Sequence, residues 1–417
     1  MSTLLEKSLL WLVSTLPFAY ALTGSVGHIA LLFTIVVACL IIVHPAKRPR
    51  PSDLAKLRPA LVFSALILLF FTYHVANSAI RGDVSELWLA LSPSLPLLCA
   101  IPIVAALSLG QNTVISAQSL ANTAMAFMPL LVLVNIGEVL WGATNRLEGL
   151  SGNALLHAFP LALVPFLTLT NWRESPIWFR ALGILSICFF MWLLAGPGQS
   201  RGPVLVMLAL LLFSLVYWGQ GLVSTRHGRW SILAVFCLLI GASWFILTST
   251  TGGRKLLILL QNLSEFDYSQ VELVEKSARL RIIMWVEGWQ AFTHSLSTLI
   301  FGYGLPHRFD AIAVDADLVN FRMTHLHNWV LTAAVGGGVV AVLIATLIVA
   351  APYGVLWFGK TTQPAQSAFV ATIACFGCAG QGLTNVLFFN DLSISLMLSL
   401  TLLVFAMSKT TRQQPKP

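Results

Sequence analysis

The sequence predicts an all-α, polytopic membrane protein, because of its composition, its recurring apolar runs and the distribution of its basic residues. Of the 417 residues, 57% are hydrophobic and only 10% are charged, and the mean hydropathy is +0.83. Soluble domains carry about a quarter charged residues. A chain this apolar cannot cover its own surface with polar groups in water, so we expect lipid around it.

Apolar runs of about 20 residues recur along the whole chain, and each is long enough to cross a bilayer as a helix. Helices are expected because backbone amides in hydrocarbon need internal partners, and the runs lack the alternating pattern of barrel strands. The fourth run contains Pro93, Pro96 and Pro102, which predicts a kinked or partly unwound helix. We predict twelve spans, at roughly 8–23, 27–43, 59–77, 87–109, 112–134, 154–170, 177–195, 203–223, 231–250, 328–350, 366–387 and 391–407.

The basic residues near the short loops predict the orientation of the spans. With a cytoplasmic N-terminus, the short outer segments hold three Lys or Arg residues, namely Arg81, Arg146 and Arg201. The inner segments hold fourteen, namely Lys7, Lys47, Arg48, Arg50, Lys56, Arg58, Arg173, Arg180, Arg226, Arg229, Lys360, Lys409, Arg412 and Lys416. Both termini are therefore expected in the cytoplasm. The first run could instead be a cleaved signal peptide, which would leave the later spans unchanged.

These predictions divide the chain into three parts. Residues 1–250 hold spans one to nine, residues 251–324 form a long periplasmic loop, and residues 325–417 hold spans ten to twelve and a cytoplasmic tail.

The net charge of +8 is expected mainly at the cytoplasmic surface, where anionic membrane lipids attract it, and we expect no nucleic-acid partner. The middles of the spans are almost free of charge, which argues against an ion-coupled transporter.

The loop is expected to contain an amphipathic helix at about 271–294, which carries Arg279 and Arg281. A helix on the membrane surface can present such guanidinium groups to lipid headgroups. The alternative is a solvated face with pairs such as Glu275 and Arg279.

The triplet 315–317, Asp-Ala-Asp, resembles a metal-binding motif of glycosyltransferases. Such triplets arise often by chance in acidic loops, so we expect no metal site.

Two histidines, His325 and His327, follow Arg322 directly before the tenth span. Histidines two apart point the same way only on an extended chain. Thr324 or Asn328 is a candidate helix cap.

Glycines follow in the tenth span. Gly338 comes eleven residues after His327, which predicts the same helical face three turns along. Small residues at Gly337 and Gly338 indicate either close helix packing or a groove for a lipid tail, and the sequence leaves both open.

Arg201 lies in a short outer turn between spans seven and eight. Its side chain could extend to phospholipid headgroups or lean towards the arginines of the loop. Several arginines at one point would repel one another unless an anion lay between them. A diphosphate fits this requirement, because guanidinium groups match phosphate oxygens.

Four motifs in order resemble the O-antigen ligase and polymerase family. They are Ser200-Arg201-Gly202, Arg281 followed by Trp285, Gly302-Tyr303-Gly304, and His327-Asn328 followed by Gly338. The twelve-span layout and the long loop before the tenth span match this family too.

The resemblance implies a GT-C-like, inverting glycosyltransferase of the bacterial inner membrane that needs neither metal nor other cofactor. Its donor would be an O-antigen linked to undecaprenyl diphosphate, and a ligase would transfer it to lipid A-core at the periplasmic face. Arg201 and Arg281 would stabilise the departing diphosphate, with Arg322 and Arg279 as weaker candidates. His327 or His325 would accept the proton of the acceptor hydroxyl. A polymerase, which uses another lipid-linked glycan as acceptor, and a non-catalytic lipid or glycan transporter remain as alternatives.

Overall fold

The computed structural model is all-helical in the residues it describes, with no strand among them. It describes residues 2–45, 54–82, 86–110, 114–141, 154–198, 200–219, 276–310, 326–359, 361–385 and 387–408, with the single positions 241, 244, 248, 249 and 312. In chain order the helices are α1 (Ser2–Leu22), α2 (Gly24–Val43), α3 (Leu54–Ile80), α4 (Leu87–Leu91), α5 (Pro96–Leu109), α6 (Ala117–Trp141), α7 (Ala154–Leu163), α8 (Ile177–Ala195), α9 (Arg201–Gly219), α12 (Lys276–Thr293), α13 (Leu296–Phe301), α14 (Trp329–Phe358), α15 (Pro364–Thr372), α16 (Cys378–Leu383) and α17 (Asp391–Met407).

Several of these helices are long and apolar enough to cross a membrane, so the chain is a multi-pass membrane protein. Within the described part there are six, lying in α2, α3, α6, α8, α9 and α14, or seven if the bent α4–α5 pair counts as one span. Two further apolar helices, at Leu156–Leu169 and Asp391–Met407, are shorter. The prediction of twelve spans is therefore confirmed only in part, and most of the predicted span 231–250 lies outside the described residues.

The proline-rich fourth span is bent, as predicted. A 3₁₀ turn (Ser92–Ser94) separates α4 from α5, and the two helices meet at 42°. Pro93 and Pro96 lie at this break, where their missing N–H groups interrupt the helical hydrogen bonds.

Two other predicted spans are also irregular, which the sequence analysis did not anticipate. The span at 154–170 changes from α7 to a 3₁₀ segment (Val164–Leu169) at Pro165. The span at 366–387 consists of α15, a π-helical turn (Ile373–Gly377) and α16.

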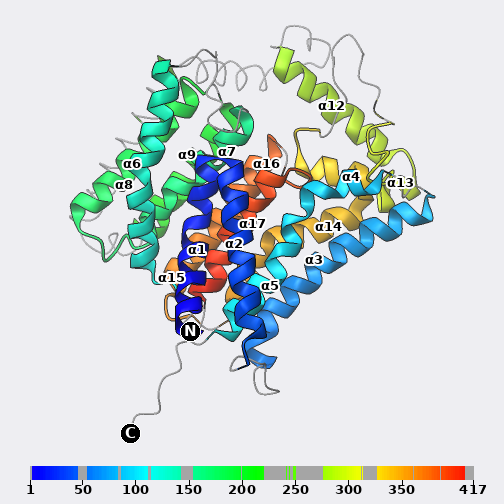
Figure 1. Ribbon diagram of the computed structural model, residues 1–417. Helices are drawn as coiled ribbons and strands as arrows, with labels where there is room; N and C mark the ends of the chain where they lie inside the picture. Colours follow the sequence, from blue (N-terminus) through cyan, green and yellow to red (C-terminus); the bar gives the residue numbers. More distant parts are fainter. Residues whose placement is uncertain are drawn as a thin grey trace.

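Helix α17 forms the centre of the molecule (Figure 1). Every residue from Leu392 to Met407 is buried, and α17 contacts α1, α5, α7, α14 and α15. A helix that is apolar on all sides is buried either in lipid or among other helices, and here other helices surround it. This explains how a helix of 17 residues occupies the core.

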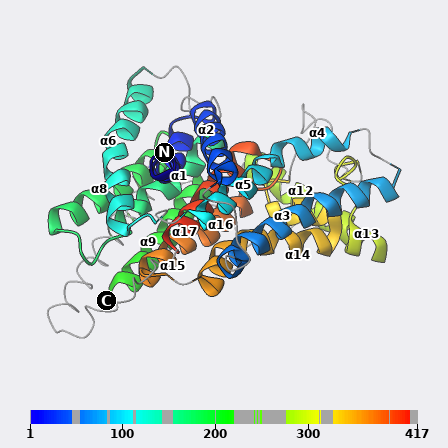
Figure 2. The ribbon, with the colours of Figure 1, turned by 60° about the horizontal axis from the view of Figure 1, so that its bottom comes forward.

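Helices α3 and α14 pack side by side and run antiparallel (Figures 1 and 2). At one end, the Arg58 guanidinium lies over the Phe358 ring, 5.0 Å from its centroid. At the other end, the Tyr73 hydroxyl donates a hydrogen bond of 2.5 Å to the Gly337 carbonyl. The end of the helix pair with Tyr73 and Gly337 adjoins the candidate site.

The loop helix predicted at 271–294 is present as α12, and α12 lies next to α13 (Figure 1). Its apolar side packs on protein, since Met284, Ala291 and Phe292 form a buried cluster with Leu326 and Val335. Its other side stays open, and Trp289 is 59% exposed there. Helix α12 is thus amphipathic as expected, with its apolar face held against α14.

Candidate functional site

Arg201 lies at the start of α9, beside the segment that follows α16. A methyl group on Gly202 would come within 2.0 Å of the Thr384 hydroxyl oxygen, so the two backbones approach closely. At the other end of α9, the Tyr217 hydroxyl donates a hydrogen bond of 2.8 Å to the Ala365 carbonyl. Helix α9 therefore runs antiparallel to residues 365–384, and Arg201 shares one end of the helices with Thr384.

The end of α16 and the segment after it lie between Arg201 and the start of α14. A methyl group on Gly382 would lie 2.6 Å from Cδ1 of Trp329. The ring of Trp329 also packs on Phe388, with 5.7 Å between their centroids. Residues 382–385 and 387–388 thus connect the neighbourhood of Arg201 to the neighbourhood of His327, which precedes Trp329 by two residues.

His327 is half-buried and is held in a left-handed backbone conformation, with φ at +50°. Asn328, one of the two predicted cap candidates, caps α14 by accepting a hydrogen bond of 3.1 Å from the Leu331 amide. The Leu326 amide donates to the Thr332 hydroxyl at 3.2 Å, which ties the chain before His327 to the first turn of the helix. Left-handed conformations of ordinary residues cost energy and concentrate at functional sites.

Because α14 begins at Trp329, His327 precedes the helix. The prediction that His327 and Gly338 share a helical face three turns apart is therefore wrong. The helix is also broken at Gly337 and Gly338, whose φ angles are −148° and +66°.

Arg281 is half-buried on α12 and belongs to the side of this helix that faces the His327 segment. Trp285 donates from its indole nitrogen to the Leu326 carbonyl, at 2.9 Å. A methyl group on Gly288 would lie 2.7 Å from Cδ1 of Leu326. Spacings of four and three residues align Arg281, Trp285 and Gly288 along one side of a helix. Arg281 is therefore one helical turn from a residue that contacts the chain next to His327.

The remaining predicted site residues fall outside the described part of the chain. Arg322 and His325 are among them, as are Asp315 and Asp317, and for Arg279 only the backbone of α12 is described. The described residues contain no group of three or more His, Cys, Asp and Glu side chains with the geometry of a metal site.

The break in α14 receives the turn that follows α13. A methyl group on Gly338 would lie 2.1 Å from the Ile300 carbonyl oxygen, and one on Gly302 would lie 2.5 Å from the Gly337 nitrogen. The Tyr303 amide donates to the Val335 carbonyl at 2.8 Å. The motif of residues 302–304 thus docks backbone to backbone on the broken helix, which only glycine permits at these positions.

This contact corrects the predicted lipid groove at Gly337 and Gly338. Both glycines are buried, and the chain at Ile300 and Gly302 fills the space beside them. The described residues leave no open groove there, and close packing, the other interpretation, accounts for the two glycines.

A polar stripe formed by α3 and the residue after it holds the same junction, and it was not predicted from the sequence. Tyr73 donates to the Gly337 carbonyl, Asn77 donates to the Phe301 carbonyl at 2.8 Å, and Arg81 donates to the Gly302 carbonyl. The signal was available in the sequence, because these three residues are spaced by four across the end of an apolar span and the turn after it. Their acceptors could not be predicted, since all three are backbone carbonyls far along the chain.

Arg308 is a second residue that the sequence analysis missed. It is only 8% exposed, its guanidinium donates to the Leu305 carbonyl at 2.8 Å, and it lies over the Phe389 ring at 5.1 Å. Phe389 in turn packs edge-on against His74, which is fully buried in α3. A lone arginine after a turn carries no sequence signal that separates it from a surface residue.

The arrangement gathers arginine-bearing stretches from distant parts of the chain at one end of the helices, with an imidazole among them. Guanidinium groups there suit a phosphate or diphosphate, and a half-buried imidazole suits proton transfer. Comparison of the chain with models of known protein families and with curated proteins found no match.

Proposed function

We propose that this chain is a glycosyltransferase of the bacterial inner membrane, with a GT-C-like architecture and a periplasmic active site. Its donor is an O-antigen linked to undecaprenyl diphosphate and its acceptor is lipid A-core, which makes it an O-antigen ligase. One observation supports the proposal most. The His327 segment contacts the Arg281 side of α12 through Trp285 and adjoins the Arg201 end of α9 through Trp329 and residues 382–384.

In the proposed reaction, the oxygen of an acceptor hydroxyl forms a bond to C1 of the donor sugar while the bond from C1 to the diphosphate oxygen breaks. The electron pair of the broken bond stays on undecaprenyl diphosphate. Arg201 and Arg281 stabilise the negative charge that grows there. His327 accepts the hydroxyl proton. A single displacement inverts the anomeric centre and needs no covalent enzyme intermediate.

The half-burial of the three groups suits these roles. A fully buried arginine could not reach a lipid headgroup, and a fully exposed one would be screened by water and salt. The hydrogen bonds around Leu326 and Asn328 support the same idea, because an acid or base acts efficiently only when it is held near its target.

An O-antigen polymerase is the second candidate, since it would use the same donor and the same residues with another lipid-linked glycan as acceptor. The test is reconstitution of the purified full chain in proteoliposomes with labelled donor, with and without lipid A-core. We expect label on lipid A-core. Lengthening of the donor without lipid A-core would favour the polymerase, and absence of any transfer would contradict both.

Two controls accompany the assay. Asp315→Ala should keep wild-type activity, and a chelator should leave the rate unchanged, because the proposed reaction needs no metal. A rate that falls on chelation and returns with a divalent cation would contradict this part of the proposal.

A further inference from the structure

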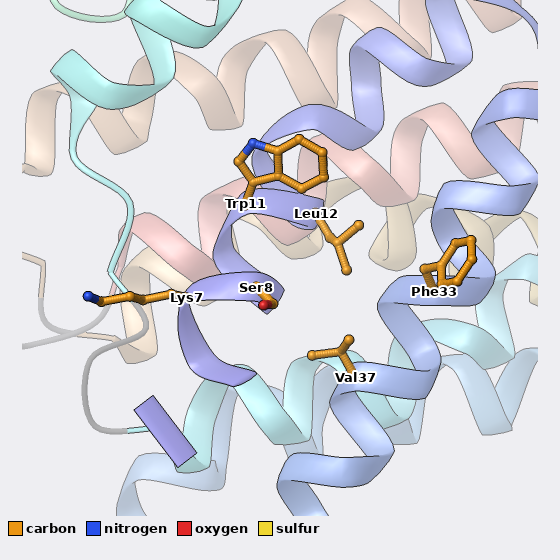
Figure 3. Close-up of a pocket in the computed structure, with 6 residues that line it drawn as sticks. All are labelled: Lys7, Ser8, Trp11, Leu12, Phe33 and Val37. Atoms are coloured by element: carbon orange, nitrogen blue, oxygen red, sulfur yellow. The ribbon is translucent and has the colours of Figure 1, made fainter. Parts of the chain in front are cut away.

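A groove of about 520 Å³ lies between α1 and α2 (Figure 3). Its lining residues are Lys7, Ser8, Trp11 and Leu12 from α1, with Phe33 and Val37 from α2. The two helices meet tightly at their connecting turn, where a methyl group on Gly27 would come within 2.1 Å of the Tyr20 ring. The groove lies away from this turn, where the helices leave space between them.

The surface around the groove is the kind that faces lipid. An 18-residue stretch of α2 has a mean hydropathy of 2.8, yet only 28% of that stretch is buried within the protein. Trp11 is 65% exposed and Phe33 is 59% exposed. The apolar side chains that α2 leaves exposed are Val26, Ile29, Leu32, Phe33, Val36, Leu40 and Val43. In a membrane protein, hydrocarbon chains cover such a face.

The polarity of the groove changes along its length. Lys7 is the one charged residue among the six that line it, and it lies near the start of α1. Trp11 follows one helical turn later, which suits the boundary between headgroups and hydrocarbon. Leu12 and Phe33 lie further from the Lys7 end, and Val37 lies opposite Ser8. Figure 3 shows Leu12 and Val37 turned towards the space between the helices, whereas the Lys7 side chain extends away from it.

From this order we propose that the groove binds one anionic diacyl phospholipid. The Lys7 ammonium pairs with the headgroup phosphate, and its flexible four-carbon stem lets it reach the rim. One acyl chain lies along Leu12, Val37 and Phe33. The basic residues place this end of α1 at the cytoplasmic surface, where anionic lipids are available. This site is separate from the glycosyl-transfer site and does not depend on it.

Native mass spectrometry of the full-length protein tests the proposal, with phosphatidylglycerol and phosphatidylcholine of identical acyl chains as probes. We expect the wild type to retain one phosphatidylglycerol in preference to phosphatidylcholine. Lys7→Gln should lower the retained phosphatidylglycerol about fivefold, the effect of one lysine near an anionic headgroup, and leave phosphatidylcholine unchanged. Val37→Trp should fill the groove and lower retention of both lipids.

Arg58→Gln is the matched control, because Arg58 is also near the cytoplasmic end of its helix but packs on Phe358 outside the groove. It should leave lipid retention unchanged. Equal retention of the two lipids by the wild type would overturn the proposal, as would an unchanged Lys7→Gln variant or an equal loss in Arg58→Gln. A dimer that excludes the lipid would identify a second copy of the chain as the occupant and overturn it too.

Discussion

The indole nitrogen of Trp285 and the carbonyl oxygen of Leu326 are 2.9 Å apart and share a hydrogen bond. This bond joins α12, which carries Arg281, to the residue directly before His327. The two residues are 41 positions apart in the chain. In the proposed reaction the bond fixes the distance between the group that stabilises the diphosphate and the group that accepts the proton.

Trp285→Phe should therefore lower the transfer rate about five- to tenfold, because the net contribution of one hydrogen bond is about 1 kcal/mol. The rate is measured in proteoliposomes at equal amounts of inserted protein. Trp289→Phe is the control, since Trp289 lies on the same helix but is 59% exposed. Equal rates for both variants would show that the bond to Leu326 has no part in the reaction.

His327 provides a test that separates backbone strain from chemistry. Both His327→Ala and His327→Gly should be inactive, because neither offers a proton acceptor. His327→Gly should nevertheless be the more stable, by about 1 kcal/mol, since glycine adopts a φ of +50° without steric cost. Thermal unfolding in detergent measures the difference.

The same pair of substitutions at His294 is the control for this comparison. His294 is exposed and is not among the described residues with positive φ. Alanine should be at least as stable as glycine there. A His327→Gly variant less stable than His327→Ala would contradict the left-handed conformation.

Gly338→Ala should lower the unfolding temperature markedly, because its methyl group would lie 2.1 Å from the Ile300 carbonyl oxygen and its φ of +66° disfavours alanine. The expected cost is about 1–3 kcal/mol. Gly354→Ala, in the same helix, should be neutral or slightly stabilising, since no atom lies within 4 Å of that methyl position. Similar unfolding temperatures for the two variants would refute the docking of residues 302–304 on the broken helix.

Gly202→Ala should reduce transfer by displacing Arg201, because the added methyl group would lie 2.0 Å from the Thr384 hydroxyl oxygen. Thr384→Gly should restore much of the activity in the double variant, since it removes the atoms that collide. The transfer rates of the wild type, the two single variants and the double variant together form a double-mutant cycle. Strictly additive losses would mean that Thr384 does not position Arg201.

The sequence predicted the features that depend on local composition. The apolar runs, the bend at Pro93 and Pro96, the amphipathic α12 and the cap at Asn328 all follow from periodicity or from the chemistry of one residue. The irregular turns that follow α7 and α15 were not predicted, because the geometry of these 3₁₀ and π-helical turns depends on their neighbours.

The site was less predictable, since it depends on contacts between distant segments. Nothing local to His327 signals a left-handed backbone, which results from the hydrogen bonds of Leu326 and Asn328 to the first turn of α14. The break at Gly337 depends on the chain arriving at Gly302. The partnership of Gly202 with Thr384 could not be read from either residue alone.

In the proposed reaction, guanidinium groups at this end of the helices stabilise the departing undecaprenyl diphosphate. The most direct measurement compares the rate of glycan transfer to lipid A-core by purified wild-type protein with that of Arg281→Gln, at equal amounts of folded protein in proteoliposomes. We expect transfer by the wild type and a loss of about 10²–10³ in the rate of the variant, as for the removal of one donor from an oxyanion site. A variant that transfers glycan at the wild-type rate would contradict this role of the guanidinium groups.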